Sequence, residues 1–230
     1  MKNRLFIILI TISNFIYSQQ VKQTIIIKKV EPKIIYNNLF NLETGERISK
    51  EEFDFLVKTN GNIKIETFYD KYGEIERRYY NPKPIEGERR NSINKNPEKG
   101  GLFPDFILET IDNKKIELDN LRGKLIIISF GLIIDNVLVN KREIVNIDSK
   151  IKASNRHTEI EYILLFRESK EEIVSVFDIR STNFKIIPNG EGFINKWNIL
   201  RFPTTVIIDK EGKFINNFQR FEIDIIELLN

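Results

Sequence analysis

The chain has 230 residues, of which 41 % are hydrophobic and 30 % are charged, as is typical of a globular protein. Its 36 basic and 33 acidic residues leave a formal net charge of +3, and its basic pairs are interleaved with acids, so we expect no nucleic-acid partner. The complete lack of cysteine excludes disulfides, thiolate nucleophiles, iron–sulfur clusters and cysteine-based zinc sites. With a single histidine, His157, no multi-histidine metal site is possible, and we expect neither a metal nor a cofactor.

The first residues, "MKNRLFIILITISNFIYSQQ", have the pattern of a secretory signal peptide. Lys2 and Arg4 give a basic start, and the apolar run from Leu5 to Ile16 is too short to span a bilayer comfortably. Small or polar residues follow around Ser18. The pattern predicts a signal peptide over residues 1–18 and a protein exported to the periplasm or the extracellular space, without stable membrane insertion after cleavage. The alternative is an uncleaved N-terminal anchor.

Residues 19–80 predict a small α+β region. The β-branched stretches "VKQTIIIKKV" and "KIIYNNLF" indicate strands. A helix then follows an N-cap at Ser49, and "NIKIETFYDKYGEIERRYYN" alternates around a Lys-Tyr-Gly turn like a β-hairpin. A unit of about 60 residues is small for independent folding, so we expect it to dock on the C-terminal part of the chain. Residues 81–101, rich in Pro and Gly, predict a linker.

Residues 102–230 alternate strand and helix signals, which favours a sheet with parallel strands and helices on both faces. The strands include two continuous apolar runs, which are typical of strands covered on both faces. In chain order we expect a hairpin around Asp112-Asn113, a helical turn ended by Gly123, a strand "KLIIISF", a helix from about Asn136 to Ile151, a strand "EIEYILLF", a helix capped by Ser169, a helix "EGFINKWNI", two strands in "TTVIIDKEGKFINNF" and a closing helix "EIDIIELL".

Three segments resemble, in order and spacing, the landmarks of the thioredoxin-like superfamily, in its extracytoplasmic TlpA-like and peroxiredoxin-like (redoxin) branch. They are "GGLFPDFILETIDNKKIELDNLRGK", "LIIISF" and "NKWNILRFPTTVIIDKEGKF". The resemblance implies an α/β fold, a thioredoxin-like three-layer sandwich with a central mixed β-sheet, over residues 102–230.

The chain departs from this family at the redox site. In the family the central strand leads to a Cys-x-x-Cys pair at the start of a helix. Counting on from Phe130 places these positions at Asp135 and Leu138, whereas counting back from "REIVNID" gives Val137 and Asn140. Neither register supplies sulfur, so thiol–disulfide exchange and thiol peroxidase chemistry are excluded.

The second element of the family's site is a cis-proline opposite the redox pair, which corresponds to Pro203. The resemblance implies that Phe202, Pro203 and Thr204 bind an extended partner strand, although a rigid strand entry without a ligand is equally compatible. We therefore expect a non-catalytic binding or structural module, with an unknown protein or peptide partner in the cleft between residues 135–140 and this loop. The alternative is a cysteine-independent enzyme that uses the same cleft, with Asp135 as acid or base. A classification as an oxidoreductase would reflect ancestry and not chemistry.

Other polar and aromatic residues have plainer interpretations. His157 is expected to be an exposed connecting residue, because no nucleophile motif accompanies it. The carboxylates of Glu143, Asp148 and Asp209 are expected to be solvated. Trp197 is expected in the core rather than as a stacking platform.

Overall fold

The computed structural model describes residues 38–59, 64–82, 97–130, 141–153, 157–176 and 182–219. All of them belong to one compact unit of the chain. Among the described residues no helix is both long and apolar enough to cross a membrane. The predicted signal peptide and the first predicted strand lie outside the described residues. The second predicted strand, "KIIYNNLF", is described from residue 38, and Leu39 and Phe40 lie in a strand as predicted.

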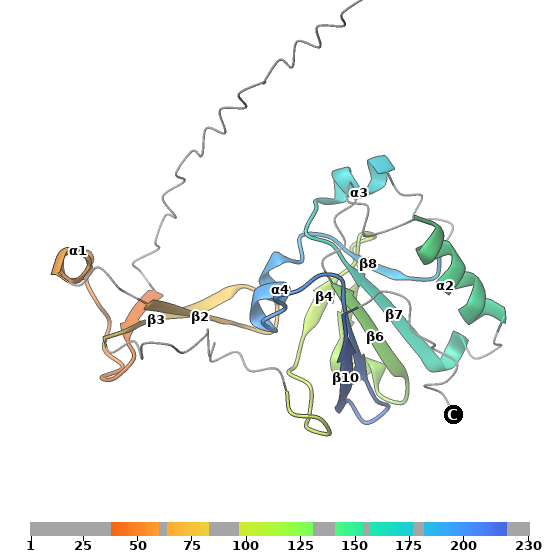
Figure 1. Cartoon of the computed structure of the whole chain (residues 1–230), viewed down its shortest axis with the longest axis horizontal. Helices are drawn as coiled ribbons and strands as arrows, with labels where there is room; N and C mark the ends of the chain where they lie inside the picture. The colour runs from red at the N-terminus through yellow and green to blue at the C-terminus, as the bar shows by residue number, and fades with distance from the viewer. Residues whose placement is uncertain are drawn as a thin grey trace, which may run out of the picture. The chain divides into compact units, whose positions relative to one another are not determined.

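A five-stranded mixed sheet forms the centre of the C-terminal region, with the strand order β10-β9-β6-β7-β8 (Figure 1). Strands β6, β7 and β8 are parallel to one another, β9 runs antiparallel to β6, and β10 runs antiparallel to β9. The bounds are β6 Leu125–Phe130, β7 Ile160–Leu165, β8 Lys185–Ile187, β9 Thr204–Ile208 and β10 Phe214–Phe218. This is the mixed central sheet expected of a thioredoxin-like sandwich.

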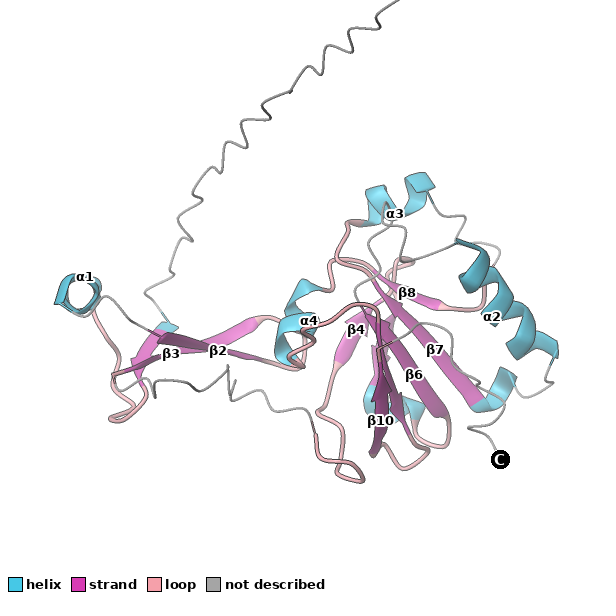
Figure 2. Ribbon diagram, in the orientation of Figure 1, coloured by secondary structure: helices cyan, strands magenta, loops and turns pink. Residues whose placement is uncertain are grey.

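Both faces of this sheet are covered, so the region has three layers (Figure 2). On one face Ile147 of α2 and Ile173 of α3 pack in a cluster with Ile127 of β6. On the other face Trp197, next to α4, packs with Ile128 of β6. The covering elements are α2 Lys141–Ala153, α3 Lys170–Val176, α4 Glu191–Lys196, the hairpin of β4 Ile107–Glu109 and β5 Lys115–Glu117, and a 3-10 helix Leu118–Leu121.

The two long strands behave as predicted. Every residue of β6 and of β7 is buried, and their hydrophobic side chains point alternately into the two core clusters, whereas Ser129 and Glu161 are buried polar residues. The capping prediction at Ser169 is also confirmed. Its hydroxyl accepts the N–H of Glu172, and the Glu172 carboxylate accepts the N–H of Ser169, which forms a capping box. These bonds lower the pKa of Glu172.

Some elements differ from the sequence prediction. Strand β8 was not predicted, because three residues are too few to show an alternating pattern. Helix α2 ends at Ala153, two residues beyond the predicted end. The predicted closing helix lies outside the described residues.

A three-stranded sheet and one helix lie between residues 38 and 82. The strand order is β1-β3-β2, with β2 and β3 antiparallel as predicted. Ser49 caps the helix, since its hydroxyl accepts the N–H of Glu52. The bounds are β1 Leu39–Asn41, α1 Lys50–Thr59, β2 Lys64–Tyr69 and β3 Ile75–Asn81. The limits of the region (residues 19–80) and of the linker (81–101) stay predictions.

The turn between β2 and β3 docks on α4 and β4, as the small size of this region leads us to expect (Figure 1). The Lys196 ammonium donates to the main-chain oxygens of Asp70 and Asp105, at 2.8 Å each. The N–H of Ile107 donates to the Lys71 oxygen at 2.7 Å. The turn is therefore recognised through its main-chain oxygens, and partial burial at this contact lowers the pKa of Lys196.

The docking requires glycine at position 192. A Cβ atom there would lie 2.0 Å from the main-chain oxygen of Gly73, which is far inside van der Waals contact. The substitution Gly192→Ala would normally stabilise a helix by up to about 1 kcal/mol. Here we expect the opposite sign, a loss of about 1–3 kcal/mol in the free energy of unfolding, because main-chain atoms must move apart. Urea denaturation measures the difference.

Hydrogen exchange of the Ile107 amide, which is bonded to the turn, should accelerate in the same variant. Glu171→Ala on α3 is the control, and it should change the free energy of unfolding by less than about 0.5 kcal/mol because Glu171 is exposed. A Gly192→Ala protein as stable as the parent would contradict this account of the contact.

Candidate functional site

The loop that carries Phe202 and Pro203 lies beside the end of the central strand β6. In the antiparallel pairing of β6 with β9, Phe130 is opposite Thr204 and Ser129 is opposite Thr205. The Phe202–Pro203 peptide bond is cis, and the two residues directly precede β9. The last residue of β6 and this loop therefore meet at one edge of the sheet.

The opposing positions fall outside the described residues. Asp135 and Leu138 in one register, and Val137 and Asn140 in the other, lie between the end of β6 and the described start of α2 at Lys141. The choice of register and any acid or base role of Asp135 stay predictions. The absence of sulfur is a property of the sequence and does not depend on the register.

A cation holds one face of Phe202. The ring is partly buried and packs against the core, and the Arg167 guanidinium lies over it at 4.9 Å from the ring centroid. The same guanidinium pairs with Glu191 of α4, with 2.8 Å between Nε and Oε2. A cation–π contact of this kind contributes about 0.5–1 kcal/mol at an exposed site. The loop is thus tied to both β7 and α4.

Sequence reasoning missed Arg167 and Glu191. Arg167 follows the carboxyl end of β7, and residues after neighbouring parallel strands meet at one edge of a sheet. That rule was available from the predicted strands, and it singles out the residues after the second apolar strand. Glu191 carried no comparable signal.

Thr204 and its neighbours line a shallow hollow beside the loop. The Thr204 hydroxyl donates to the Arg201 main-chain oxygen at 2.6 Å, and the residue is buried. The hollow has a volume of about 210 Å³, and its rim includes Leu200, which is 60 % exposed. Of the three predicted binding residues only Thr204 lines it.

Three buried hydroxyls lie beneath this edge of the sheet. The Ser129 hydroxyl is 3.0 Å from the Tyr162 hydroxyl and 2.9 Å from the Thr205 hydroxyl, on three adjacent strands. Burial raises the pKa of Tyr162 well above its usual value, so the phenol stays neutral at physiological pH. Because the hydrogen-bond partners of Ser129 are hydroxyls, it lacks the adjacent base of an activated nucleophile. The network is suited to joining strands rather than to catalysis.

The predicted core role of Trp197 is confirmed. The side chain is 1 % exposed, and its ring packs against the four rings of Phe103, Phe106, Phe130 and Phe193 at centroid distances of 5.1–5.7 Å. Phe130 is the last residue of the central strand, so the cluster supports the site edge from one face of the sheet.

The prediction that Asp148 is solvated is wrong. This residue is 5 % exposed, accepts the N–H of Asn183 at 3.1 Å and pairs with Lys152 one turn away. Asp148 is buried because it lies three positions before Ile151 and next to Ile147, on the face of α2 that packs in the core. The carboxylate satisfies a main-chain donor, as buried charges generally do.

Two other polar predictions have separate outcomes. Asp209 accepts the N–H groups of Glu211 and Lys213 and so organises the β9–β10 turn. His157 begins a short 3-10 helix, His157–Glu159, before β7. Its exposure and the side chain of Glu143 lie outside what is described. In the described ranges no three His, Asp or Glu side chains are grouped so that they could hold a metal ion.

No protein-family profile and no curated protein matches this sequence. Among solved structures, a proposed protein disulfide isomerase from Bacteroides thetaiotaomicron is similar, with 20 % identity and a TM-score of 0.47, over 58 % of this chain and 86 % of the other. The mitochondrial 2-Cys peroxiredoxin from Plasmodium falciparum has 16 % identity and a TM-score of 0.46, over 57 % and 89 %. The thioredoxin domain of a thiol-disulfide oxidoreductase from Bacteroides vulgatus has 13 % and 0.45, over 54 % and 89 %.

Identities this low carry no activity over to this chain, whose thioredoxin-like fold is defined by its own strand order. The strand order defines a thioredoxin-like fold, and the sequence contains no cysteine that could form a redox pair in it.

The hydroxyl network allows a stability test. Ser129→Ala removes the hydroxyl that both Tyr162 and Thr205 contact, and we expect it to lower the free energy of unfolding by about 1–3 kcal/mol. Tyr162→Phe removes the bond to Ser129 but keeps the bond between Ser129 and Thr205, and it should cost less, about 0.5–1.5 kcal/mol. Urea denaturation of both variants gives the comparison. Equal stability of Ser129→Ala and the parent would show that the network does not join the strands.

Proposed function

We propose that this protein is exported and binds an extended segment of a protein or peptide partner at Phe202, Pro203 and Thr204, without redox chemistry. The observation that carries the proposal is the free main chain of Phe202. Within the described part of the chain, neither its N–H nor its C=O makes a hydrogen bond. A donor and an acceptor on one residue, placed just before β9 begins, can pair with the main chain of an extended segment.

The surroundings of this residue support the same proposal. Arg167 and Glu191 hold the Phe202 ring from one side, so the main chain is fixed before a partner arrives. A preorganised loop loses less conformational entropy on binding. Leu200 adds an exposed apolar side chain two residues away. Without sulfur a bound segment cannot be trapped as a mixed disulfide, so association is reversible.

Peptide selection tests the binding site. We expect a displayed random peptide library to yield binders of the chain. Phe202→Ala should weaken their affinity about tenfold or more, because the ring that fixes the position of the pairing main chain is lost. Isothermal titration calorimetry measures this, and Leu102→Ala is the matched control. Leu102 is 66 % exposed and pairs with Lys213, at the end of the β9–β10 hairpin away from Pro203.

Binders equally sensitive to Leu102→Ala and Phe202→Ala, or insensitive to both, would contradict the proposed site. An insulin reduction assay with the purified chain should give no turnover above buffer. Reductase activity that purifies with the chain would contradict the non-redox role.

Export is tested by N-terminal sequencing. When the full chain is expressed in a bacterial host, the protein recovered from the periplasm or medium should begin near Gln19, because the predicted signal peptide ends at Ser18. Ile8→Lys should retain the uncleaved chain in the cell, since a charge interrupts the apolar run. An uncleaved chain in the membrane fraction would support the N-terminal anchor instead.

A further inference from the structure

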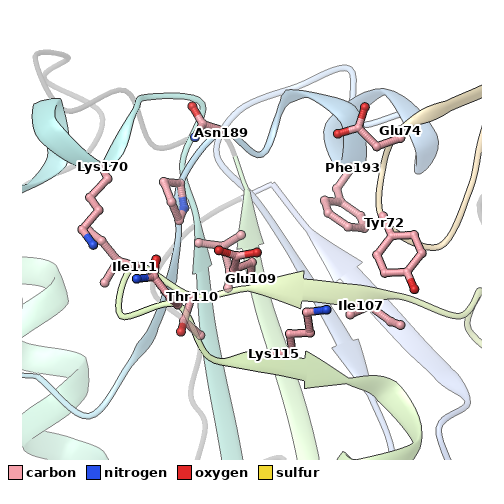
Figure 3. A pocket seen from close by; sticks show the side chains of 13 residues that line it. Tyr72, Glu74, Ile107, Glu109, Thr110, Ile111, Lys115, Lys170, Asn189 and Phe193 are labelled. Carbon is pink, nitrogen blue, oxygen red and sulfur yellow. The ribbon is translucent and has the colours of Figure 1, made fainter.

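A second and larger cavity lies apart from the Phe202–Pro203 loop. Its volume is about 400 Å³, in the range of small-molecule sites. Its walls come from the β2–β3 turn, the β4–β5 hairpin, the start of α3, the segment after β8, and α4 (Figure 3). Phe202, Pro203 and Thr204 are not among its lining residues, so this cavity is independent of the proposed partner site.

Four charged side chains line this cavity, two of each sign. They are Glu74, Glu109, Lys115 and Lys170. Elsewhere in the described residues acids and bases commonly pair, as Lys124 does with Glu161 and Lys210 with Glu159. Among the described ion pairs none involves any of these four. Glu109 and Lys115 are directly opposite each other on the β4–β5 hairpin, so their charges offset one another. Lys170 and Glu74 have no such partner among the described ion pairs and are available to a ligand.

The charges are separated along the cavity (Figure 3). Lys170 and Asn189 lie on one wall, and Glu74 and Tyr72 lie on the opposite wall. Glu109 and Lys115, which are opposite each other in the β4–β5 pairing, lie between these walls (Figure 3). A ligand that spans the cavity therefore meets the Lys170 ammonium at one end and the Glu74 carboxylate at the other.

Apolar side chains complete the lining. Ile107, Ile187 and Phe193 contribute to the same cavity. Phe193 is a buried core residue of α4, and its ring occupies the space that a Cβ atom on Gly73 of the turn would need. The cavity is therefore bounded by elements that are packed against each other, which fixes the distance between its charged walls.

We infer that this cavity binds a short peptide, of two or three residues, with a free amino and a free carboxyl group. The carboxylate lies toward Lys170 and Asn189, and the ammonium group lies toward Glu74. The apolar side chains contact the peptide between its ends. Glu74 would repel a simple anion and Lys170 a simple cation, whereas a zwitterion complements both walls.

Calorimetry with trialanine as the probe tests this inference. We expect the parent protein to bind trialanine, and N-acetyl-trialanine and trialaninamide to bind about tenfold more weakly or worse, since each lacks one terminal charge. Lys170→Met and Glu74→Gln should each weaken trialanine binding to a similar degree. Lys213→Met and Glu211→Gln, in the exposed β9–β10 turn, are the matched controls and should leave binding unchanged.

Pairing protein variants with probe variants locates each end of the peptide. Glu74→Gln should not weaken N-acetyl-trialanine further, because the group that Glu74 contacts is already absent, and Lys170→Met should likewise not weaken trialaninamide further. Additive losses in these pairs would overturn the assignment, as would equal binding of all three probes or no binding of trialanine. Phe202→Ala should leave trialanine binding intact, so failure here is distinguishable from failure of the partner site.

Discussion

The aromatic packing around Trp197 is the contact on which the arrangement of the site depends. One indole ring touches Phe130 at the end of the central strand, Phe193 on α4, and Phe103 and Phe106 ahead of the β4–β5 hairpin. These residues come from segments far apart in the chain. Because protein interiors are close-packed, a displacement of any one ring must be accommodated by the others. The same cluster therefore supports the Phe202–Pro203 loop, the α4 helix and the cavity wall that α4 provides.

A thioredoxin-like redox site consists of a scaffold and a reactive cysteine pair, and this chain has no cysteine for the pair. The scaffold remains as a strand end, an adjoining proline loop and a buried hydroxyl network below them. Side chains that cannot exchange electrons, Arg167 and Glu191, stabilise the loop. Without sulfur, covalent capture of a partner is excluded, and in the part of the chain that the structure describes the main-chain groups of Phe202 make no hydrogen bond. The role that we propose for this loop is therefore binding.

Much of the fold could be predicted from the sequence, because the strongest signals coincide with the best-packed elements. The runs "KLIIISF" and "EIEYILLF" became the fully buried strands β6 and β7, and the caps at Ser49 and Ser169 are made as their residue types predict. Strand β8 could not be predicted, because it is only three residues long and forms through its pairing with β7. The burial of Asp148 could not be predicted, because its carboxylate depends on a hydrogen bond from the Asn183 amide, 35 positions away. Similarly, nothing local links Tyr72 and Glu74 to Lys170, so the cavity that they share could not be predicted.

The docking of the β2–β3 turn has a consequence for how this protein could diversify. Lys196 and Ile107 hold the turn by its main-chain oxygens, and the close approach of Gly192 involves only the backbone of Gly73. The side chains of Tyr72 and Glu74 take no part in this attachment, although both face the cavity. The turn can therefore accept new side chains at these two positions while keeping its place. Substitution is therefore constrained at Gly192 by the backbone of Gly73, whereas Tyr72 and Glu74 can be replaced. Such replacements would change the specificity of the cavity wall and leave the docked turn in place.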